Sequence, residues 1–598
     1  MAPSASSGVS AQPSLEASTL PLHDLRRHAQ ASLIHLLDGT HGVHRGMKKF
    51  LVIDPGVSGP LALVASISVL KEHGVDKLFH LQPGIGQNIE ANLHDGRDGH
   101  EPKVEIFFLM RPAIANVNLV ASLVMELGEG RGEDRYHFTA CFTPRKTVIC
   151  EKILASEGVL GSLHLEEFPA MGLIPFDEDV VSMEMEHVFR DVQVDKDFSA
   201  LFDVASAIMQ LQNMCGRIPR VQGKGRCAKV VCNILQRMQA EAASDGSGGG
   251  KSGRGSGEGP RIDGIVLLDR SVDLISPMCT QLTYEGLVDE ILGIHNGLVE
   301  VPAAAQPQPP EPKKAARGGH ASAAAAAPAK KVPLNSSDML FRELRDLNFA
   351  SVGPKLRNRT MHMREEYKEI NQRTFSEVHQ FVKKLNIMPI LDRHTELASL
   401  IQERTACDAA FIRRLRHEQD LLDGRGVEAA CEYVEELLFL HKEGLESVLR
   451  LLSLISLSNG GIPKKQYDAL RWGILHLHGH QHLFTLQSLH AAGLIKRVDG
   501  GRNHFTQIKK SFRLIGDDDL TGSEDDSNPT DISYVYSGYA PLSCRIVDAA
   551  MRPLGLGAME EVLKLIPGPQ FDFSVGGLHH RDQANGAEDS GADASGKR

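Results

Sequence analysis

The sequence has no long, uninterrupted hydrophobic run. Its longest apolar stretch lies near residues 60–70, far short of the roughly 20 apolar residues that cross a bilayer as a helix. The first residues, MAPSASSGVSAQPS, lack the basic segment and the following apolar segment of a secretory signal. We therefore expect a protein that is neither secreted nor membrane-spanning.

Paired cysteines are also missing. The nine cysteines form no CxxC pair and no evenly spaced framework, and their number is odd. Several lie inside apolar runs, which is typical of reduced thiols that pack as small hydrophobic side chains. Reduced thiols indicate a reducing compartment, so we expect a cytoplasmic protein.

The chain has no excess of positive charge. Its 65 Lys and Arg residues oppose 76 Asp and Glu residues, which gives a net charge of −11. A mildly acidic chain has no overall attraction for phosphate backbones or anionic lipid, so binding to either would need a local patch. Apolar residues make up 42% and charged residues 24%, the balance of a globular protein that can bury a large core.

Motifs for nucleotide binding and nucleophilic catalysis are incomplete. PGIGQ at residues 83–87 lacks the third glycine of a dinucleotide fingerprint, and QGKGR at residues 222–226 has glycine where a phosphate-binding loop has Ser or Thr after its lysine. GVSG at residues 56–59 has the wrong spacing for a nucleophile elbow. We expect no catalytic residue and no cofactor.

Two histidine-containing segments could suggest a metal site. HEQDL at residues 417–421 begins like HExxH, but Leu421 stands where the second histidine is needed. The histidines of LHLHGHQHL, residues 475–483, would share one face only in a strand, and the flanking sequence predicts a helix. We expect partly exposed histidines and no metal.

The most enzyme-like cluster is Asp269, Arg270 and Asp273. Carboxylates around an arginine could act in acid–base chemistry, or they could form a structural network that joins a strand end to the next helix. Because no nucleophile or metal-ligand set lies nearby in the sequence, the structural interpretation is favoured.

Alternating strand-like and helical segments predict two α/β domains with parallel sheets. The first is expected over residues 48–158, and the second is expected to be discontinuous, over residues 159–270 and 525–573. A strand-like segment at residues 532–536 marks the return of the chain to the second domain. Residues 271–524 are predicted to form a large helical insertion.

Four segments have the composition of disordered chain. Two are inserts, at residues 244–260 and 300–333, and two are tails, at residues 1–47 and 574–598. For the first tail, helix is the alternative to disorder.

Several long stretches resemble one protein family, in the same order. They read GIVLLDRSVDLISPMCTQLTYEGLVDEILGI at residues 264–294, NPTDISYVYSGYAPLSCR at residues 528–545 and LIPGPQF at residues 565–571, with further matches at residues 173–184 and 209–228. This pattern is similar to the SM (Sec/Munc-type) family of SNARE-binding regulators of membrane fusion, and within it to the vacuolar sorting class.

The resemblance implies a three-domain arch, in which a helical insertion offers a hairpin as a template for SNARE helices. It also implies a protein without enzymatic activity that is a subunit of the HOPS and CORVET tethering complexes, held there by a helical vacuolar sorting subunit. Such a protein would be cytoplasmic and peripheral on endosomal, lysosomal or vacuolar membranes, bound through its partners.

The resemblance also assigns roles to particular residues. SNARE binding is expected around residues 338–384, including Asn348, Phe349, Val352 and Gly353, and the partner subunit is expected to bind around residues 472–494, where His480 and Leu483 would face outward. The fold-specifying residues of the family motif are expected to be Asp269, Arg270, Asp273, Pro277, Gln281, Tyr284, Glu285, Tyr536, Gly538, Tyr539, Ala540, Pro541 and Arg545.

One departure and one alternative function remain. In the family, a further apolar strand and helix follow the PGP stretch, whereas here the residues after Phe571 soon become polar, so we expect either an uncovered edge in the second domain or a truncated product. The alternative function is that of a winged-helix-containing protein that binds nucleic acid or serves as a scaffold. The winged helix would be formed by residues 470–496 and a basic wing at residues 497–512, with Arg502, Lys509 and Lys510.

Overall fold

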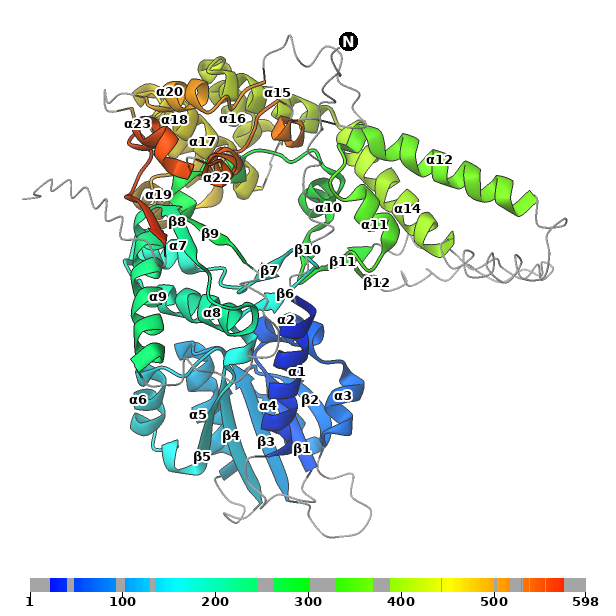
Figure 1. Ribbon diagram of the computed structural model, residues 1–598, viewed down its shortest axis with the longest axis vertical. Helices are drawn as coiled ribbons and strands as arrows, with labels where there is room; N and C mark the ends of the chain where they lie inside the picture. The colour runs from blue at the N-terminus through cyan, green and yellow to red at the C-terminus, as the bar shows by residue number, and fades with distance from the viewer. Residues whose placement is uncertain are drawn as a thin grey trace, which may run out of the picture.

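The computed structural model arranges the chain as two α/β domains followed by a larger helical part (Figure 1). It describes residues 22–39, 48–92, 103–128, 135–244, 262–301, 330–368, 388–441, 444–498, 503–516, 529, 531–536, 538–553 and 555–574. Most of both predicted inserts, most of the C-terminal tail and Arg502 lie outside these residues.

The first domain is built on a five-stranded parallel sheet in the order β2-β1-β3-β4-β5. The strands are β1 (Lys48–Ile53), β2 (Val75–His80), β3 (Val104–Met110), β4 (Tyr136–Phe142) and β5 (Leu163–Glu167). The helices are α1 (Leu22–Asp38), α2 (Pro55–Val64), α3 (Ile67–Glu72), α4 (Ile85–Ala91), α5 (Ile114–Gly128) and α6 (Val148–Ser156).

Both faces of the sheet are buried at its three central strands, β1, β3 and β4, which are largely apolar, whereas the edge strands β2 and β5 mix buried and exposed residues. Phe50 and Val52 pack with α4, α5 and α6 on one face, and Leu51 and Ile53 pack with α1, α2 and α3 on the other. The predicted boundary at residue 158 falls too early, because β5 pairs with β4 and completes the first sheet.

Helix α1 shows that part of the N-terminal segment is structured. Leu33 and Leu37 pack against the first sheet, while Leu22 and Leu25 contact Leu173 of the second domain. The helix therefore joins the two α/β domains.

The second domain has a three-stranded sheet in the order β13-β8-β9. Strands β8 (Arg220–Lys224) and β9 (Gly264–Leu268) are parallel, as predicted, whereas β13 (Gln570–Ser574) adds antiparallel to β8. The domain also contains β6 (Ile174–Pro175), β7 (Val181–Ser182), α7 (Val188–Arg190), α8 (Ala200–Cys215) and α9 (Arg226–Ser244).

The returning segment, by which we mean the described residues from Asp531 to Ser574, differs from the prediction. Ile532–Val535 is a short 3₁₀ helix and not a strand, because the Asp531 carboxylate accepts a hydrogen bond from the Ser533 N–H and turns the chain. After it come α22 (Leu542–Met551) and α23 (Glu560–Leu563), whose apolar side chains pack mainly with the helical part. Only β13 rejoins the sheet of the second domain.

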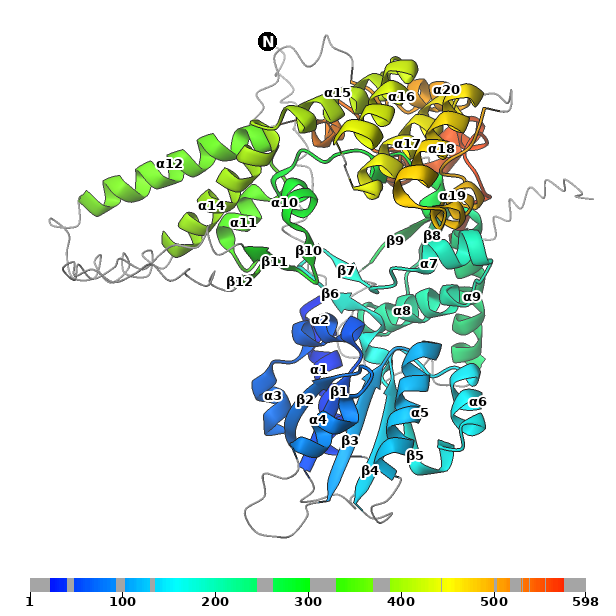
Figure 2. The same cartoon turned by 180° about the vertical axis from the view of Figure 1, so that it is seen from behind.

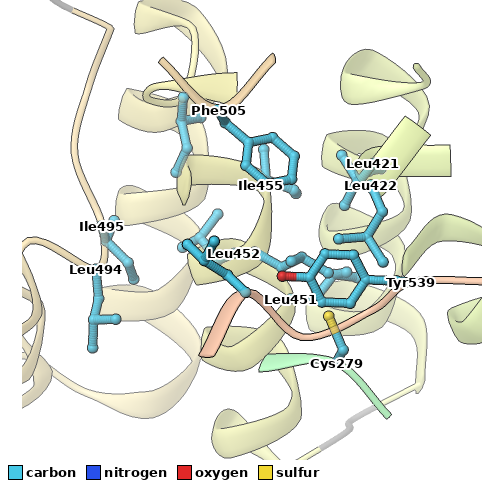
Figure 3. Close-up of a cluster of buried hydrophobic side chains, with 14 of the residues drawn as sticks. Cys279, Leu421, Leu422, Leu451, Leu452, Ile455, Leu494, Ile495, Phe505 and Tyr539 are labelled. Carbon is cyan, nitrogen blue, oxygen red and sulfur yellow. The ribbon is translucent and has the colours of Figure 1, made fainter. Parts of the chain in front are cut away.

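The helical part has two separate cores. The first contains α10 (Tyr284–Leu292), α11 (Met339–Leu344), α12 (Phe349–Lys368) and α14 (Met388–Thr405). The second contains α15 (Ala409–Asp423), α16 (Val427–Glu436), α17 (Leu445–Asn459), α18 (Lys464–His478), α19 (His482–Ala491) and α20 (Phe505–Ser511). Figure 3 shows Tyr539 from the returning segment packed among the leucines of this second core, near Cys279.

The insertion is not wholly helical. Strands β10 (Ile294–His295), β11 (Leu298–Val301) and β12 (Lys330–Pro333) form a small antiparallel sheet. Val301 pairs with Lys330, so both ends of the predicted 300–333 insert are strand residues. Residues 302–329 lie outside the described chain.

A buried carboxylate stabilises the first domain where β1 meets α2. Asp54 is 2% exposed, and it accepts hydrogen bonds from Gly56 N–H, Arg111 and Asn116. Burial alone would raise the pKa of Asp54, but the bonds from Arg111 and Gly56 outweigh it and hold that pKa below its ordinary value.

We predict that Asp54→Ala lowers the free energy of unfolding by about 1–3 kcal/mol at pH 7, because it removes a charged acceptor from several donors. Since the folded pKa is depressed, this contribution is complete above about pH 4 and is lost as pH falls through the folded pKa. Urea unfolding followed by circular dichroism measures the loss. Asp76→Ala, which removes only an exposed 3.9 Å pair with Lys48, is the matched control and should change little.

Candidate partner-binding surfaces

The family-motif residues form an internal seam, defined here as residues 279–285 and their contacts. On one side the Leu282 N–H donates to the Val535 carbonyl, 2.7 Å away. On the other side the Phe349 N–H donates to the Leu282 carbonyl, 2.9 Å away, and the Tyr284 N–H donates to the Leu347 carbonyl. The seam therefore joins the returning segment to the start of α12.

The aspartates of the motif bind backbone N–H groups. Asp269 accepts from Cys227 and Ala228 at the start of α9, at 2.9 and 2.6 Å. Gly225, at φ +122°, leaves the space that the Asp269 carboxylate fills. Asp273, which is buried, accepts from Ser276 and from the Ser543 N–H at the start of α22. Both carboxylates are used to join chain segments.

The remaining motif residues are also engaged inside the protein. Gln281 donates to the Tyr536 hydroxyl, Arg545 pairs with Asp531, and Gly538 has a φ of +97°, which favours glycine. Tyr539, Ala540 and Pro541 are buried. Pro277 and Arg270 are exposed, Pro277 within the 3₁₀ turn Ser276–Met278 and Arg270 at the edge of an apolar cavity of about 230 Å³.

Charged residues that the sequence analysis did not assign complete the seam. Glu418, 4% exposed, accepts from the N–H and hydroxyl of Thr280, and burial raises its pKa. Arg450 donates to the Met278 carbonyl and pairs with Glu290 at 2.7 Å. The HExxH-like start at residue 417 is thus explained by a structural glutamate.

A buried histidine joins three helices at the root of the α12–α14 hairpin. His394 of α14 is 0% exposed; it contacts the Tyr284 hydroxyl of α10 at 2.8 Å and the Asp338 carboxylate at 3.0 Å. Asp338 in turn accepts from the N–H groups of Leu340 and Phe341 and begins α11. Nothing in the sequence around His394 signals this contact, since its partners lie far along the chain.

The α12–α14 hairpin projects from the body, as both views of the ribbon show (Figures 1 and 2). Val352 is fully buried in the first helical core. Its side chain therefore cannot contact a partner directly, in contrast to the prediction. Asn348 and Phe349 are half-buried, and Gly353 is exposed. Residues 369–384 of the predicted binding region lie outside the described chain.

The outer face of α12 carries the exposed side chains. Pro354, Arg357 and Met361 recur at intervals of three and four residues on the side opposite Val352 and Leu356. Met361 is 52% exposed. This face, which we call the α12 outer face, has the spacing of a helix-recognition surface.

A second exposed surface lies on α18, α19 and the π-helical segment Leu437–His441, and we call it the α18–α19 patch. It consists of Phe439, Leu440, Trp472, Leu477, Leu483 and Phe484, all exposed. Trp472 and Phe484 are 65% and 74% exposed, and His480 beside them is exposed as expected. A glycine at position 473 lets the Phe439 ring approach α18 closely, since a Cβ there would lie 3.2 Å from that ring.

The described residues offer little support for binding of a metal, a membrane or a nucleic acid. Among them no group of three or more His, Cys, Asp or Glu side chains is placed to hold a metal ion, and no helix combines the length and apolar character of a bilayer crossing. In the predicted basic wing, the Lys509 ammonium donates to the Leu422 carbonyl, so Lys509 serves packing and is not presented to a nucleic acid.

Comparison with known proteins places these features in a family. The Sec1 family pattern matches residues 49–598. A vacuolar protein-sorting-associated protein 33 homolog of Arabidopsis thaliana is 39% identical over 97% of this chain and 90% of its own length. Vacuolar protein sorting-associated protein 33A of Rattus norvegicus is 38% identical over 92% of this chain and 86% of its own.

One solved structure also superposes on most of the chain. It is the Unc18–syntaxin 1 complex from Monosiga brevicollis, with a TM-score of 0.51 and 16% identity, covering 89% of this chain and 87% of that one. At this identity the likeness is one of fold.

We predict that Asp273→Ala costs about 2–3 kcal/mol of unfolding free energy, because three buried donors lose a charged acceptor. Asp548→Ala, which removes an exposed pair with Arg552, is the control and should stay within about 0.5 kcal/mol. Urea unfolding measures both. An Asp273→Ala protein as stable as the control would show that the seam does not depend on this carboxylate.

Proposed function

Because the chain belongs to the Sec1 family, we propose that it is a SNARE-binding subunit of a HOPS- or CORVET-type tethering complex, promoting vesicle docking and fusion at endosomes, lysosomes or vacuoles. The observation that carries this is the 38–39% identity to vacuolar sorting-associated proteins over nearly the whole chain. In this role the protein is a binding protein without a catalytic step, cytoplasmic and held on membranes by its partners.

SNARE binding is assigned to the α12 outer face. A SNARE motif is a flexible segment that becomes helical on assembly, so its binding carries an ordering cost. A rigid helix that presents Pro354, Arg357 and Met361 at helical spacing offers such a segment a preformed partner. If the surface holds two segments side by side, each ~1.4 kcal/mol that it adds to transition-state stabilisation speeds their assembly about tenfold.

Two of the residues that the sequence assigned to SNARE binding, Asn348 and Val352, have a structural role in this proposal. Asn348 accepts from the Ala350 N–H and donates to the Tyr534 carbonyl, and Val352 packs in the core. They hold the base of α12, while Gly353 and the outer face are free to meet a partner.

The helical partner subunit is assigned to the α18–α19 patch. Large exposed apolar patches mark interaction sites, and α18 packs against both α19 and the segment Leu437–His441, the elements that carry these exposed side chains. Trp and Phe anchors are typical of the central residues of interfaces, and Trp472, Phe484 and Leu483 are of this kind. The patch and the α12 outer face belong to different helical cores, so both partners can bind at once.

We predict that Met361→Asp weakens binding of a SNARE-motif peptide about tenfold, because it puts a charge at the centre of the apolar contact. Fluorescence anisotropy with a labelled peptide and the full chain measures the affinity. Met551→Asp is the matched control, since Met551 is 79% exposed at the end of α22. Wild-type affinity in the Met361→Asp protein would refute SNARE binding on this face.

We predict that Trp472→Ala combined with Phe484→Asp abolishes assembly with a co-expressed helical subunit of the vacuolar protein sorting-associated protein 16 type. Loss of large aromatic anchors costs about 2–4 kcal/mol each at an interface centre. Size-exclusion chromatography detects the complex. Met361→Asp serves as the reciprocal control and should retain the subunit; a complex that survives the double substitution would move the interface elsewhere.

A further inference from the structure

Arg345 and Ser336 tie the root of the hairpin to Asp177 of the second α/β domain. Arg345 follows α11, and its side chain is 13% exposed. Its Nε lies 2.8 Å from the Glu285 carboxylate of α10, and its Nη1 lies 2.7 Å from the Asp177 carboxylate. The guanidinium thus bridges two carboxylates from separate parts of the chain, a geometry that its planar fork suits.

Asp177 reaches across from the loop between β6 and β7. Besides Arg345, it accepts hydrogen bonds from the N–H and hydroxyl of Ser336, at 3.1 and 2.8 Å. Its side chain is only 9% exposed. Both Ser336 and Arg345 flank α11, so this carboxylate holds the two ends of the segment that leads into the hairpin. We call Asp177, Glu285, Ser336 and Arg345 the root clamp.

A second contact lies on the same side of the molecule. Asn296, in the turn between β10 and β11, approaches Gly59 of α2 so closely that a side chain at position 59 would collide with it. Figures 1 and 2 both show β6 and β7 beside β10, close to α2. The start of the helical insertion therefore rests on both α/β domains.

The clamp sits where a small rotation has a large effect. Arg345 precedes Phe349, the first residue of α12, by four positions. The Arg345 carbonyl accepts a hydrogen bond from the Glu285 N–H at 3.1 Å. Helix α12 has 20 residues and so extends about 30 Å. A rotation of about 10° at its base would move its tip by about 5 Å, roughly one helical turn.

We propose that Arg345 is the positioning residue of the α12–α14 hairpin, and that its clamp to Asp177 fixes the hairpin relative to the two α/β domains. The consequence for SNARE binding rests on the proposed function, whereas the mechanical role does not. When the clamp opens, the hairpin keeps its own core but samples several orientations. A partner that contacts both the hairpin and the body then meets the right geometry only part of the time.

The first experiment measures orientation without any partner. Spin labels are attached in the full chain at Met361→Cys on α12 and Ile67→Cys on α3, both exposed positions, with the exposed Cys407 and Cys544 replaced by serine. We expect one narrow distance distribution, which Arg345→Gln broadens. Asp177→Asn breaks the same contact from the other domain and should broaden it as well.

The control is Arg342→Gln on α11, three residues before Arg345, which removes only a 3.8 Å contact between exposed side chains of Arg342 and Glu178. It should leave the distance distribution narrow. Arg345→Lys, which cannot bridge both carboxylates, should broaden it although it keeps the charge. A distribution that stays narrow in either Arg345→Gln or Asp177→Asn overturns the proposal, so it stays testable if one variant fails to fold.

The second experiment separates this proposal from the proposed function. If the correct orientation is populated one-tenth of the time, the apparent affinity for a SNARE-motif peptide that touches hairpin and body falls about tenfold. Broadened distances together with weaker binding support both proposals. Broadened distances with unchanged binding support the clamp and count against SNARE capture by an oriented hairpin, whereas unchanged distances overturn the clamp whatever the peptide does.

Discussion

The structure depends on the backbone hydrogen bonds of the seam, residues 279–285. This segment is held between residues that lie far away in the sequence: Leu282 binds Val535 on one side and Phe349 on the other. Thr280 is held by Glu418 of the second helical core. A buried carboxylate is stable only when donors surround it, so the hydrogen bonds that Glu418 accepts from Thr280 require the seam to be formed. Both helical cores and the returning segment are therefore positioned by one short stretch of chain.

This arrangement places the two proposed binding surfaces on separate cores of one insertion. The α12–α14 hairpin belongs to the first helical core and the α18–α19 patch to the second. The seam connects these two cores. Each surface can be shaped by its own core. Their relative placement is then a property of the seam and of the root clamp, and not of either surface.

Much of the fold was predictable because it depends on local patterns. The alternation of strand-like and helical segments predicted two α/β domains with parallel strands, and the structural interpretation of Asp269 and Asp273 agrees with the N–H groups that they bind. The strand expected at residues 532–536 was wrong, because Asp531 turns the chain there. The small sheet within the insertion was missed because β10 has only two residues.

The candidate sites were predictable only as regions. The spacing on α12 does not reveal which side faces the body until α14 is in place, and for this reason the sequence placed Val352 in the binding region without showing that its side chain is buried. His394, Glu418 and Arg345 were not foreseen, because each is defined by partners more than fifty residues away.

The pairing of β11 with β12 has a consequence for the connection between them. Val301 and Lys330 are neighbours across a strand pair, so the two points of the fold that the intervening residues connect lie side by side. Closing a loop costs only about 0.6 kcal/mol more for each doubling of its length. A change in the length of the connection between β11 and β12 therefore alters the entropy of closing it only slightly, and the strand pair itself holds the two ends together.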